Sequence, residues 1–213
     1  MSWGVKSDGT TPRIVTSTLW EVRFPRLVIA LAVGAGLGCA GALLQGIFAN
    51  PLAEPSIIGV SSGGAVFASG LLAIASLAGV ERSYGFLKWG TALAAFIGAL
   101  LTTLLVYSLS RVQGKTVVVN LILVGVAINA MAGGFVTLFS FIGGTMAQSQ
   151  VVFWQLGSLA GAGWSSAVIT LIITVIGIVI ACLCAPKMDL LALGENQARH
   201  LGVNVERFRL CVI

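Results

Sequence analysis

Charge is the scarcest property of this sequence. Charged residues make up 9% of the 213 residues, whereas hydrophobic residues make up 57%. Soluble domains carry about 25% charged residues, so this composition excludes a soluble globular protein. The seven acids and twelve bases fall between long apolar runs, where a charge costs least. The net charge of +5 therefore belongs to loops and gives no reason to expect nucleic acid as a partner.

Residues that carry catalysis or bind metals are equally sparse. His200 is the single histidine, and its place beside Arg199 in a polar loop is typical of a surface residue, not of a haem ligand. The four cysteines lie in or beside apolar runs, and Cys182 and Cys184 lack the His or Cys companions that zinc needs. Paired carboxylates and a Ser–His–Asp set are also missing from the sequence. We therefore expect neither an enzyme nor a bound cofactor or metal.

Two glycine motifs match parts of nucleotide-binding sequences, but neither has the context that such a site requires. Residues 36–41 match G-x-G-x-x-G, yet they lie inside an apolar run and not between a strand and a helix. The spacing of Gly34 and Gly38 instead predicts the close approach of a neighbouring helix. Residues 114–116 match the end of a phosphate loop, but Leu109 stands where its first glycine would be. Any ATP must therefore be hydrolysed by a partner.

What the sequence has in abundance is apolar runs long enough to cross a membrane. About 20 apolar residues in a helix span a hydrocarbon core of about 30 Å. Residues 1–19 are polar, lack the apolar region of a signal peptide and predict an extended or disordered arm. We therefore predict an all-α, polytopic membrane protein with five spans, near residues 27–48, 57–78, 89–109, 117–142 and 165–185.

The segments outside these spans refine the prediction. Residues 153–164 are too short and glycine-rich to cross, and their tryptophans suit a membrane interface. Residues 208–213 look like the opening of another span. Lysine and arginine bias does not orient the chain, because alternating spans place six bases on each side. These are Arg111, Lys115, Lys187, Arg199, Arg207 and Arg209 on one side, and Lys6, Arg13, Arg23, Arg26, Arg82 and Lys88 on the other.

The stretch 23–65 has the pattern of a transport pathway rather than of a plain anchor. The first apolar run ends in the segment 50–55, Asn-Pro-Leu-Ala-Glu-Pro, where two prolines and a carboxylate stop the helix. The second apolar run follows at once and contains a small-residue break, Ser-Ser-Gly-Gly, at 61–64. A tight polar hinge between two spans, followed by such a break, indicates a route through the membrane.

The polar segment 187–207 is predicted to form two short helices. Asp189 is the expected N-cap of the first, Gly194 separates the two, and residues 195–201 form the second. Gly202 suits the left-handed conformation that ends a helix. A solvated amphipathic loop is the alternative, but the segment has more apolar side chains than a free loop would expose, which indicates a protein partner. These side chains are Leu190, Leu191, Leu193, Ala198 and Leu201.

Several motifs, taken in order, resemble one known family. They are R-x-P-R from Arg23, GALLQG at 41–46, NPLAEP at 50–55, GVSSG at 59–63, WQLGSL at 154–159 and LLALGENQARHLGV at 190–203. From about residue 20 to its end, the chain is similar to the permease subunits of bacterial ABC importers for iron–siderophores, haem and cobalamin.

This resemblance implies a fold of about ten helices per subunit, of which the five spans here match the second to the sixth. One span would then precede Arg23 and four would follow Ile213, as in a fragment or a truncated reading frame. The resemblance also implies a multi-pass protein of the cytoplasmic membrane that works as a dimer of permease subunits. Two ATPase subunits would lie at the cytoplasmic face and a substrate-binding protein outside. The expected cargo is an iron–siderophore first, haem second and cobalamin third.

The resemblance further implies roles for individual residues. Asn50, Pro51 and Leu52 match a cytoplasmic gate. Arg23 and Arg26 match residues that dock the external binding protein. Ser61, Ser62 and Asn129 are assigned to the pathway, because the fourth span matches a helix that lines the route at the dimer interface. The segment 187–207 matches a cytoplasmic loop that docks the ATPase, through Leu190, Leu191, Leu193, Gly194, Glu195, Ala198, Leu201 and Gly202.

Each of these roles has an alternative that the sequence leaves open. The hinge also fits an ordinary loop, and Arg23 and Arg26 also fit anchors at the membrane interface. Asn129 and Asn120 also fit interhelical hydrogen bonds. The residues of a second cytoplasmic gate, which the family has at the start of the fourth span, are also left unassigned. Val118 and Val119 stand there, where the family often has small hydroxyl residues. An ion-coupled secondary transporter or a passive channel is the alternative function, although no ionisable residue lies deep in a span.

Overall fold

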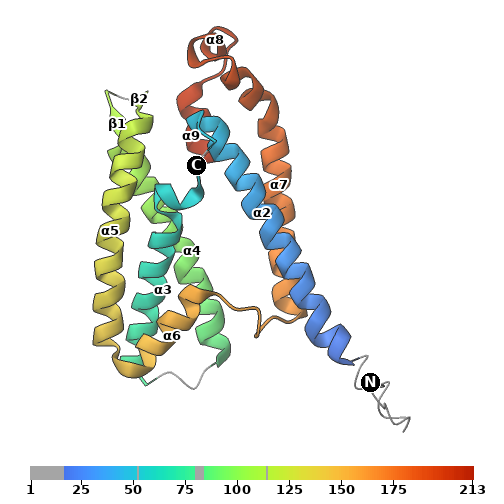
Figure 1. The fold of residues 1–213 in the computed structure, drawn as a ribbon, viewed down its shortest axis with the longest axis vertical. Coiled ribbons are helices and arrows are strands. Elements are labelled where there is room, and N and C mark those ends of the chain that lie inside the picture. The colour runs from blue at the N-terminus through green and yellow to red at the C-terminus, as the bar shows by residue number, and fades with distance from the viewer. Residues whose placement is uncertain (1–16, 52, 80–83, 114) are drawn as a thin grey trace, which may run out of the picture. The chain divides into compact units, whose positions relative to one another are not determined.

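The computed structural model describes residues 17–51, 53–79, 84–113 and 115–213, which form two compact units. Unit 1 combines the described residues up to Ala40 with Ser158–Ala185, and unit 2 combines Gly41–Gly157 with Pro186–Ile213. Two long helices, α2 (Phe24–Phe48) and α7 (Trp164–Ala192), each contribute residues to both units (Figure 1). The contacts within each unit position the candidate site residues.

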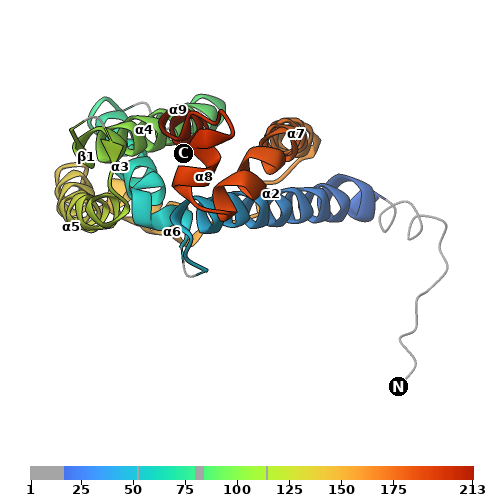
Figure 2. The same ribbon diagram turned by 90° about the horizontal axis from the view of Figure 1, so that it is seen from above.

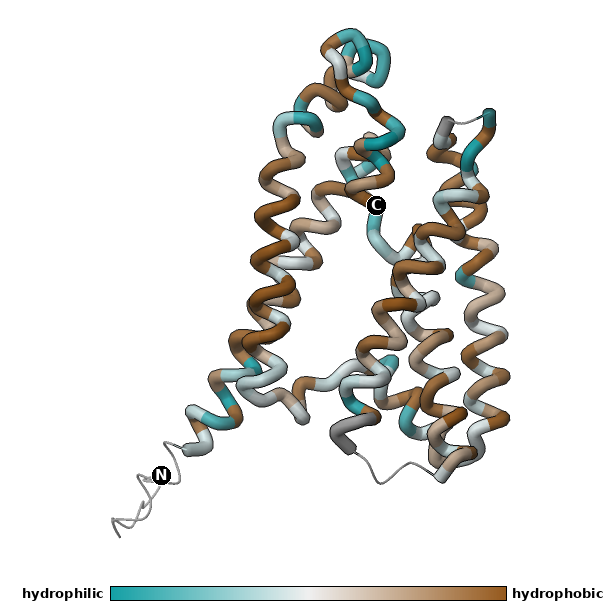
Figure 3. Tube along the Cα trace, turned by 180° about the vertical axis from the view of Figure 1, so that it is seen from behind, coloured by the Kyte–Doolittle hydropathy of each residue, from teal (hydrophilic) through white to brown (hydrophobic). Residues whose placement is uncertain are grey.

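Five helices of the described chain are long and apolar enough to cross a membrane, as the sequence predicts. A short π-helical turn, η1 (Leu19–Arg23), leads into α2 and completes the first span. The other spans are α3 (Val60–Leu77), α4 (Tyr84–Leu109), α5 (Val118–Ile142) and α7. Hydrophobic residues dominate along these helices and hydrophilic residues gather near their ends (Figure 3). The prediction of an all-α, polytopic protein is confirmed.

The last span is longer than predicted. The sequence places its end at residue 185, before Pro186, but α7 continues to Ala192 with this proline inside it. A proline removes one backbone hydrogen bond, a loss that membrane helices tolerate when other groups satisfy the freed carbonyl. Continuation of the helix is favourable, because its final turn buries the side chain of Leu191. Asp189 therefore lies inside α7, and the prediction that it caps a separate helix is wrong.

A further helix, α6 (Gly144–Leu156), connects α5 to the loop that leads to α7. The sequence predicts only an interfacial segment here, at 153–164, so most of α6 was missed. The helix packs against α3 and buries Ala147 and Val151. The Ser76 hydroxyl donates a hydrogen bond of 2.9 Å to the Gly143 carbonyl, which ties the end of α3 to the start of α6.

Unit 2 is built on α3, α4 and α5, which lie side by side when seen from above (Figure 2). The helices α3 and α4 approach closely, since a Cβ added to Gly63 would lie 2.5 Å from the Gly98 carbonyl oxygen. Small residues allow membrane helices to pack this closely. Between α4 and α5 the chain forms a short antiparallel hairpin of β1 (Arg111–Val112) and β2 (Lys115–Thr116), which the sequence does not predict.

Unit 1 pairs the first part of α2 with the first part of α7. The Trp164 indole N–H donates to the Trp20 carbonyl at 2.9 Å, and the two rings lie 5.4 Å apart. Close packing was predicted at Gly34 and Gly38, but no described atom lies within 4 Å of a Cβ built on either. Gly36 faces Thr174 of α7 instead, at 3.6 Å. Gly36 points about 200° away from Gly34 and Gly38 around the helix, so α7 packs on a different face of α2, and close packing at Gly34 and Gly38 stays a prediction.

Candidate functional site

The predicted gate lies in a tight turn after α2. The Asn50 amide donates to the Gln45 carbonyl at 3.1 Å, and the Ala53 amide donates to the Asn50 carbonyl at the same distance. Pro51 is exposed within this turn, whereas Leu52 lies outside the described residues. The chain then enters a short 3₁₀ helix, η2 (Pro55–Ile58), which leads into α3. The hinge is therefore an ordered turn, and its role as a gate stays a prediction.

An apolar cluster, which we term the hinge core, holds this turn in place within unit 2. It joins the end of α2, the hinge, the end of α4 and the start of α5, and Met188 of α7 packs against it. Because these segments contact one cluster, the hinge, the β1–β2 hairpin and the end of α7 lie at the same end of unit 2. The members of the hinge core are Leu44, Ile47, Phe48, Ala53, Ile58, Val106, Tyr107 and Leu121.

Asn129 of α5 joins the hinge to α3. Its Nδ2 donates to the Ser56 carbonyl at 3.0 Å, and the Ser62 hydroxyl donates to its Oδ1 at 2.6 Å. Both partners are half-buried, whereas Ser61 is exposed. The structure thus brings Asn129 and Ser62 together and forms the interhelical hydrogen bond that the sequence allows as an alternative. A pathway role for Ser61, Ser62 and Asn129 stays a prediction.

The two arginines at the start of α2 differ in their surroundings. Arg26 is half-buried, and its Nη2 donates to the Ala160 carbonyl at 3.1 Å, so it links α2 to the loop before α7. Arg23 is exposed. Arg23 is thus the more accessible of the two charges and Arg26 has a structural contact of its own, and docking of a binding protein by Arg23 and Arg26 stays a prediction.

The predicted ATPase-docking segment forms a compact turn around α8 (Glu195–His200). Gly194 precedes the helix with a φ of 112° and Gly202 follows it with a φ of 86°, a left-handed backbone that favours glycine. The break at Gly194, the second helix and the left-handed Gly202 are confirmed. Glu195 and Arg199 lie 3.9 Å apart in the expected i, i+4 pair, which contributes a few tenths of a kcal/mol.

The apolar side chains of this segment divide into two groups. Leu193 and Leu201 are 63% and 60% exposed, whereas Leu191 and Ala198 are 7% and 0% exposed. Leu190 is half-buried. The exposed apolar surface is thus smaller than the sequence suggests, because Leu191 and Ala198 pack inward. Leu193 and Leu201 remain as the apolar residues that a partner would touch.

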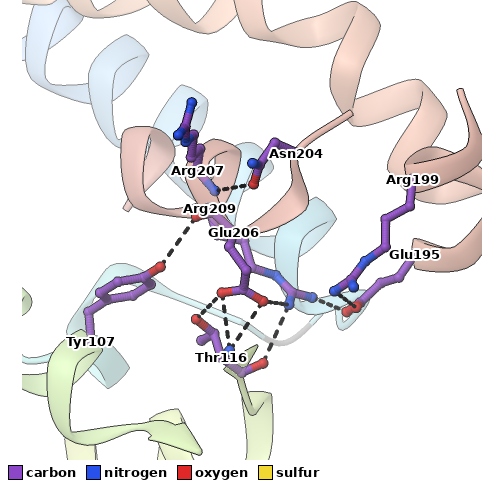
Figure 4. A network of polar contacts seen from close by, with 8 residues as sticks. All are labelled: Tyr107, Thr116, Glu195, Arg199, Asn204, Glu206, Arg207 and Arg209. Atoms are coloured by element: carbon purple, nitrogen blue, oxygen red, sulfur yellow. Dashed lines mark hydrogen bonds and ion pairs between the residues drawn. The ribbon is translucent and has the colours of Figure 1, made fainter. Parts of the chain in front are cut away.

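A polar cluster centred on Arg209 connects this segment to the β1–β2 hairpin (Figure 4). Arg209 belongs to α9 (Val205–Val212), and its side chain is only 4% exposed. Its guanidinium pairs with Glu195 of α8 and with Glu206 of α9, the latter at 3.9 Å. Glu206 in turn accepts hydrogen bonds from the Thr116 hydroxyl at 2.7 Å and from the Thr116 amide at 3.1 Å.

Sequence reasoning missed the functional potential of these residues. Thr116 and Glu206 are 90 positions apart, and no periodic pattern connects them. One signal was present, since Arg209 stands between Phe208 and Leu210 at the opening of an apolar segment. A charge in such a place requires partners or exposure.

Comparison with known proteins identifies the family. The model of the FecCD transport family matches residues 5–213, nearly the whole chain. The chain belongs to the FecCD transport family. It is 36% identical over 197 residues to a cobalamin import system permease of Halobacterium salinarum, covering 92% of this chain and 50% of that protein. It is 34% identical over 194 residues to a hemin transport system permease of Yersinia pestis, covering 90% and 56%.

A solved structure supports the same assignment. The fold matches an inward-facing conformation of a putative metal-chelate type ABC transporter with a TM-score of 0.78 and 30% identity. The match covers 98% of this chain and 63% of that one. The chain spans about half the length of the curated relatives it matches. Membership of the FecCD transport family agrees with the prediction of a multi-pass protein of the cytoplasmic membrane.

Proposed function

We propose that this chain belongs to the membrane-spanning subunit of an ATP-driven importer for a metal chelate. The observation that carries the proposal is the family match over residues 5–213, on a chain with five candidate spans. The α8 segment supports it, because a rigid turn with exposed Leu193 and Leu201 suits docking of a protein. This segment lies at the same end of unit 2 as the hinge, where an ATPase could act on a gate at residues 50–52.

The partners follow from the same reasoning. The sequence has no complete phosphate loop, so the ATP would be hydrolysed by two ATPase subunits docked at α8. A second permease subunit would complete the route, and a substrate-binding protein would dock on the opposite face, to which the alternation of spans assigns Arg23. ATP binding and hydrolysis would then bias the route between two states of access.

The cargo is proposed at the level of chemical class. The relatives carry names for hemin and cobalamin transport, and the solved neighbour is named for a metal chelate. Within this class we propose an iron chelate, siderophore or haem. Cobalamin is the third candidate, supported by the similarity to the cobalamin import permease of Halobacterium salinarum.

Uptake by the reconstituted transporter tests this function. The full-length permease, its ATPase and its binding protein are placed in liposomes, and uptake of a ferric siderophore, haemin and cyanocobalamin is measured. We expect uptake of one chelate that requires both ATP inside and the binding protein outside. Uptake driven by an ion gradient without ATP would instead indicate a secondary transporter, and uptake with neither would indicate a channel.

Charge reversal at Arg23 tests the outward face. Arg23→Glu is expected to weaken docking of the binding protein by up to about tenfold at low salt, with a smaller loss at high salt, because exposed charge pairs are screened. The measurement is binding of the external protein to proteoliposomes at two ionic strengths. Lys88→Glu is the control, an exposed base that the alternation of spans places on the same side. Unchanged docking with normal insertion would support the anchor interpretation of Arg23.

A further inference from the structure

The Arg209 cluster joins three parts of unit 2 that are far apart in sequence. Arg209 lies in α9, Glu195 begins α8, and Thr116 ends the β1–β2 hairpin (Figure 4). Arg209 pairs with Glu195 through Nη2, and its Nη1 donates to the Thr116 carbonyl at 3.4 Å. An arginine suits this position, because its planar guanidinium donates in several fixed directions at once.

Glu206 links α9 to the hairpin, and Tyr107 links α9 to the end of α4. The Glu206 carboxylate accepts from both the amide and the hydroxyl of Thr116, and the Tyr107 hydroxyl donates to the Glu206 carbonyl at 3.3 Å. Tyr107 also belongs to the hinge core. A displacement of α9 therefore moves the strand that contains Thr116.

Thr116 stands immediately before α5. Val117 is the N-cap of that helix, and the Leu121 amide donates to the Val117 carbonyl at 3.0 Å. The same helix contains Asn129, which binds the Ser56 carbonyl of η2, directly after the hinge. Motion at Thr116 is thus carried along a continuous helix to η2, which follows the turn that contains the predicted gate.

Stability alone does not explain this cluster. Removing a charge from water costs several kcal/mol, and a buried ion pair is often no more stable than an apolar replacement. The Arg209 Nε is buried with no hydrogen-bond partner among the described residues, a further cost. The cluster holds α8, α9 and the hairpin in one fixed arrangement. Apolar contacts are not directional and would allow more arrangements of these elements.

We propose that Arg209 is a positioning residue that transmits the displacement of α8 to the start of α5, through Glu195 on one side and through Glu206 and Thr116 on the other. This inference rests on the proposed function, in which the ATPase docks on the segment around α8. The cluster then links the energy-supplying partner to the hinge without contacting ATP or cargo.

Two variants break the link at different points. Arg209→Met removes its centre, and Glu195→Gln removes only the charge on the α8 side, at a residue that is 46% exposed. Arg207→Met is the matched control, since it makes the same substitution two residues away on the same helix, at an exposed position. All are made in the complete transporter with its ATPase and its binding protein, loaded with the chelate that the uptake assay selects.

The ratio of stimulated to basal ATP hydrolysis, and the chelate imported per ATP, are expected to fall about tenfold in Arg209→Met and Glu195→Gln. The double variant is expected to be no worse than Arg209→Met alone, because both changes break one connection. Recovery of the ATPase with the permease is expected to stay unchanged in Arg209→Met, whose residue is not among those assigned to docking, and Arg207→Met is expected to stay within about twofold of the parent. A merely structural role would lower the recovered transporter but leave these ratios unchanged.

Normal ratios in Glu195→Gln, or in an inserted Arg209→Met, would overturn the inference. If Arg209→Met does not insert into the membrane, the two ratios measured for Glu195→Gln alone test the inference. Failure of the proposed function would give a different result. In that case Leu193→Asp, at an exposed position of the segment around α8, would leave recovery of the ATPase with the permease unchanged.

Discussion

Leu193→Asp is expected to abolish recovery of the ATPase with the permease. Leu193 is 63% exposed beside the turn at Gly194, where a docked partner would cover it. A carboxylate in a desolvated groove without a partner costs several kcal/mol, and each 1.4 kcal/mol lowers affinity about tenfold. Insertion is expected to be normal, because the residue lies after the end of α7. The measurement is co-purification of the ATPase, together with hydrolysis stimulated by the loaded binding protein.

Two companion variants separate charge from shape. Asn196→Asp adds the same charge to the same exposed segment at a position that is already polar, and it is expected to change recovery little. Gly202→Val is expected to lower recovery, because a β-branched residue resists the φ of 86° that ends α8. Equal recovery for all three variants, with normal transport, would mean that the segment is only a solvated loop.

The sequence predicts the spans well because their signal is local. Each span is a single run of apolar residues, and the hydrophobic thickness of a membrane sets its length. The errors arise where a local rule competes with a longer-range effect. Pro186 predicts the end of a helix, but the burial of Leu191 favours the continuation of α7 to Ala192. The sequence of α6 contains polar residues and does not form a long apolar run, so the helix was not predicted. Its packing against α3 stabilises it.

The contacts of the candidate site can be predicted less completely from the sequence, for the same reason. The left-handed Gly202 and the Glu195–Arg199 pair follow from spacing within one turn of helix, and both are found. The bond from Asn129 to Ser56 and the clamp of Glu206 on Thr116 connect residues 73 and 90 positions apart. The sequence alone gives no means of pairing them, since several polar residues could have served.

Gly125→Ala is expected to destabilise the protein and to impair transport, although it adds a single methyl group. Gly125 is buried in α5, and a Cβ built there would overlap the carbonyl oxygen of Ile57 in η2, directly after the hinge. The obstacle is backbone, so no side-chain rotation relieves it, and overpacking of this kind costs about 1–3 kcal/mol. Asn129 lies one turn further along α5, so a displaced hinge also loses its bond to Ser56.

Gly134→Ala is the matched control on the same helix. No described atom lies within 4 Å of a Cβ at Gly134, and alanine is favoured over glycine in a helix by about 1 kcal/mol. We expect the midpoint of thermal unfolding to fall for Gly125→Ala and to stay level or rise for Gly134→Ala, with ATP-driven uptake lost only in the former. The same midpoint and uptake in both variants would show that α5 does not hold the hinge through this contact. The hinge would then be free to move independently of α5, and the connection from Thr116 to the predicted gate would be broken at its last step.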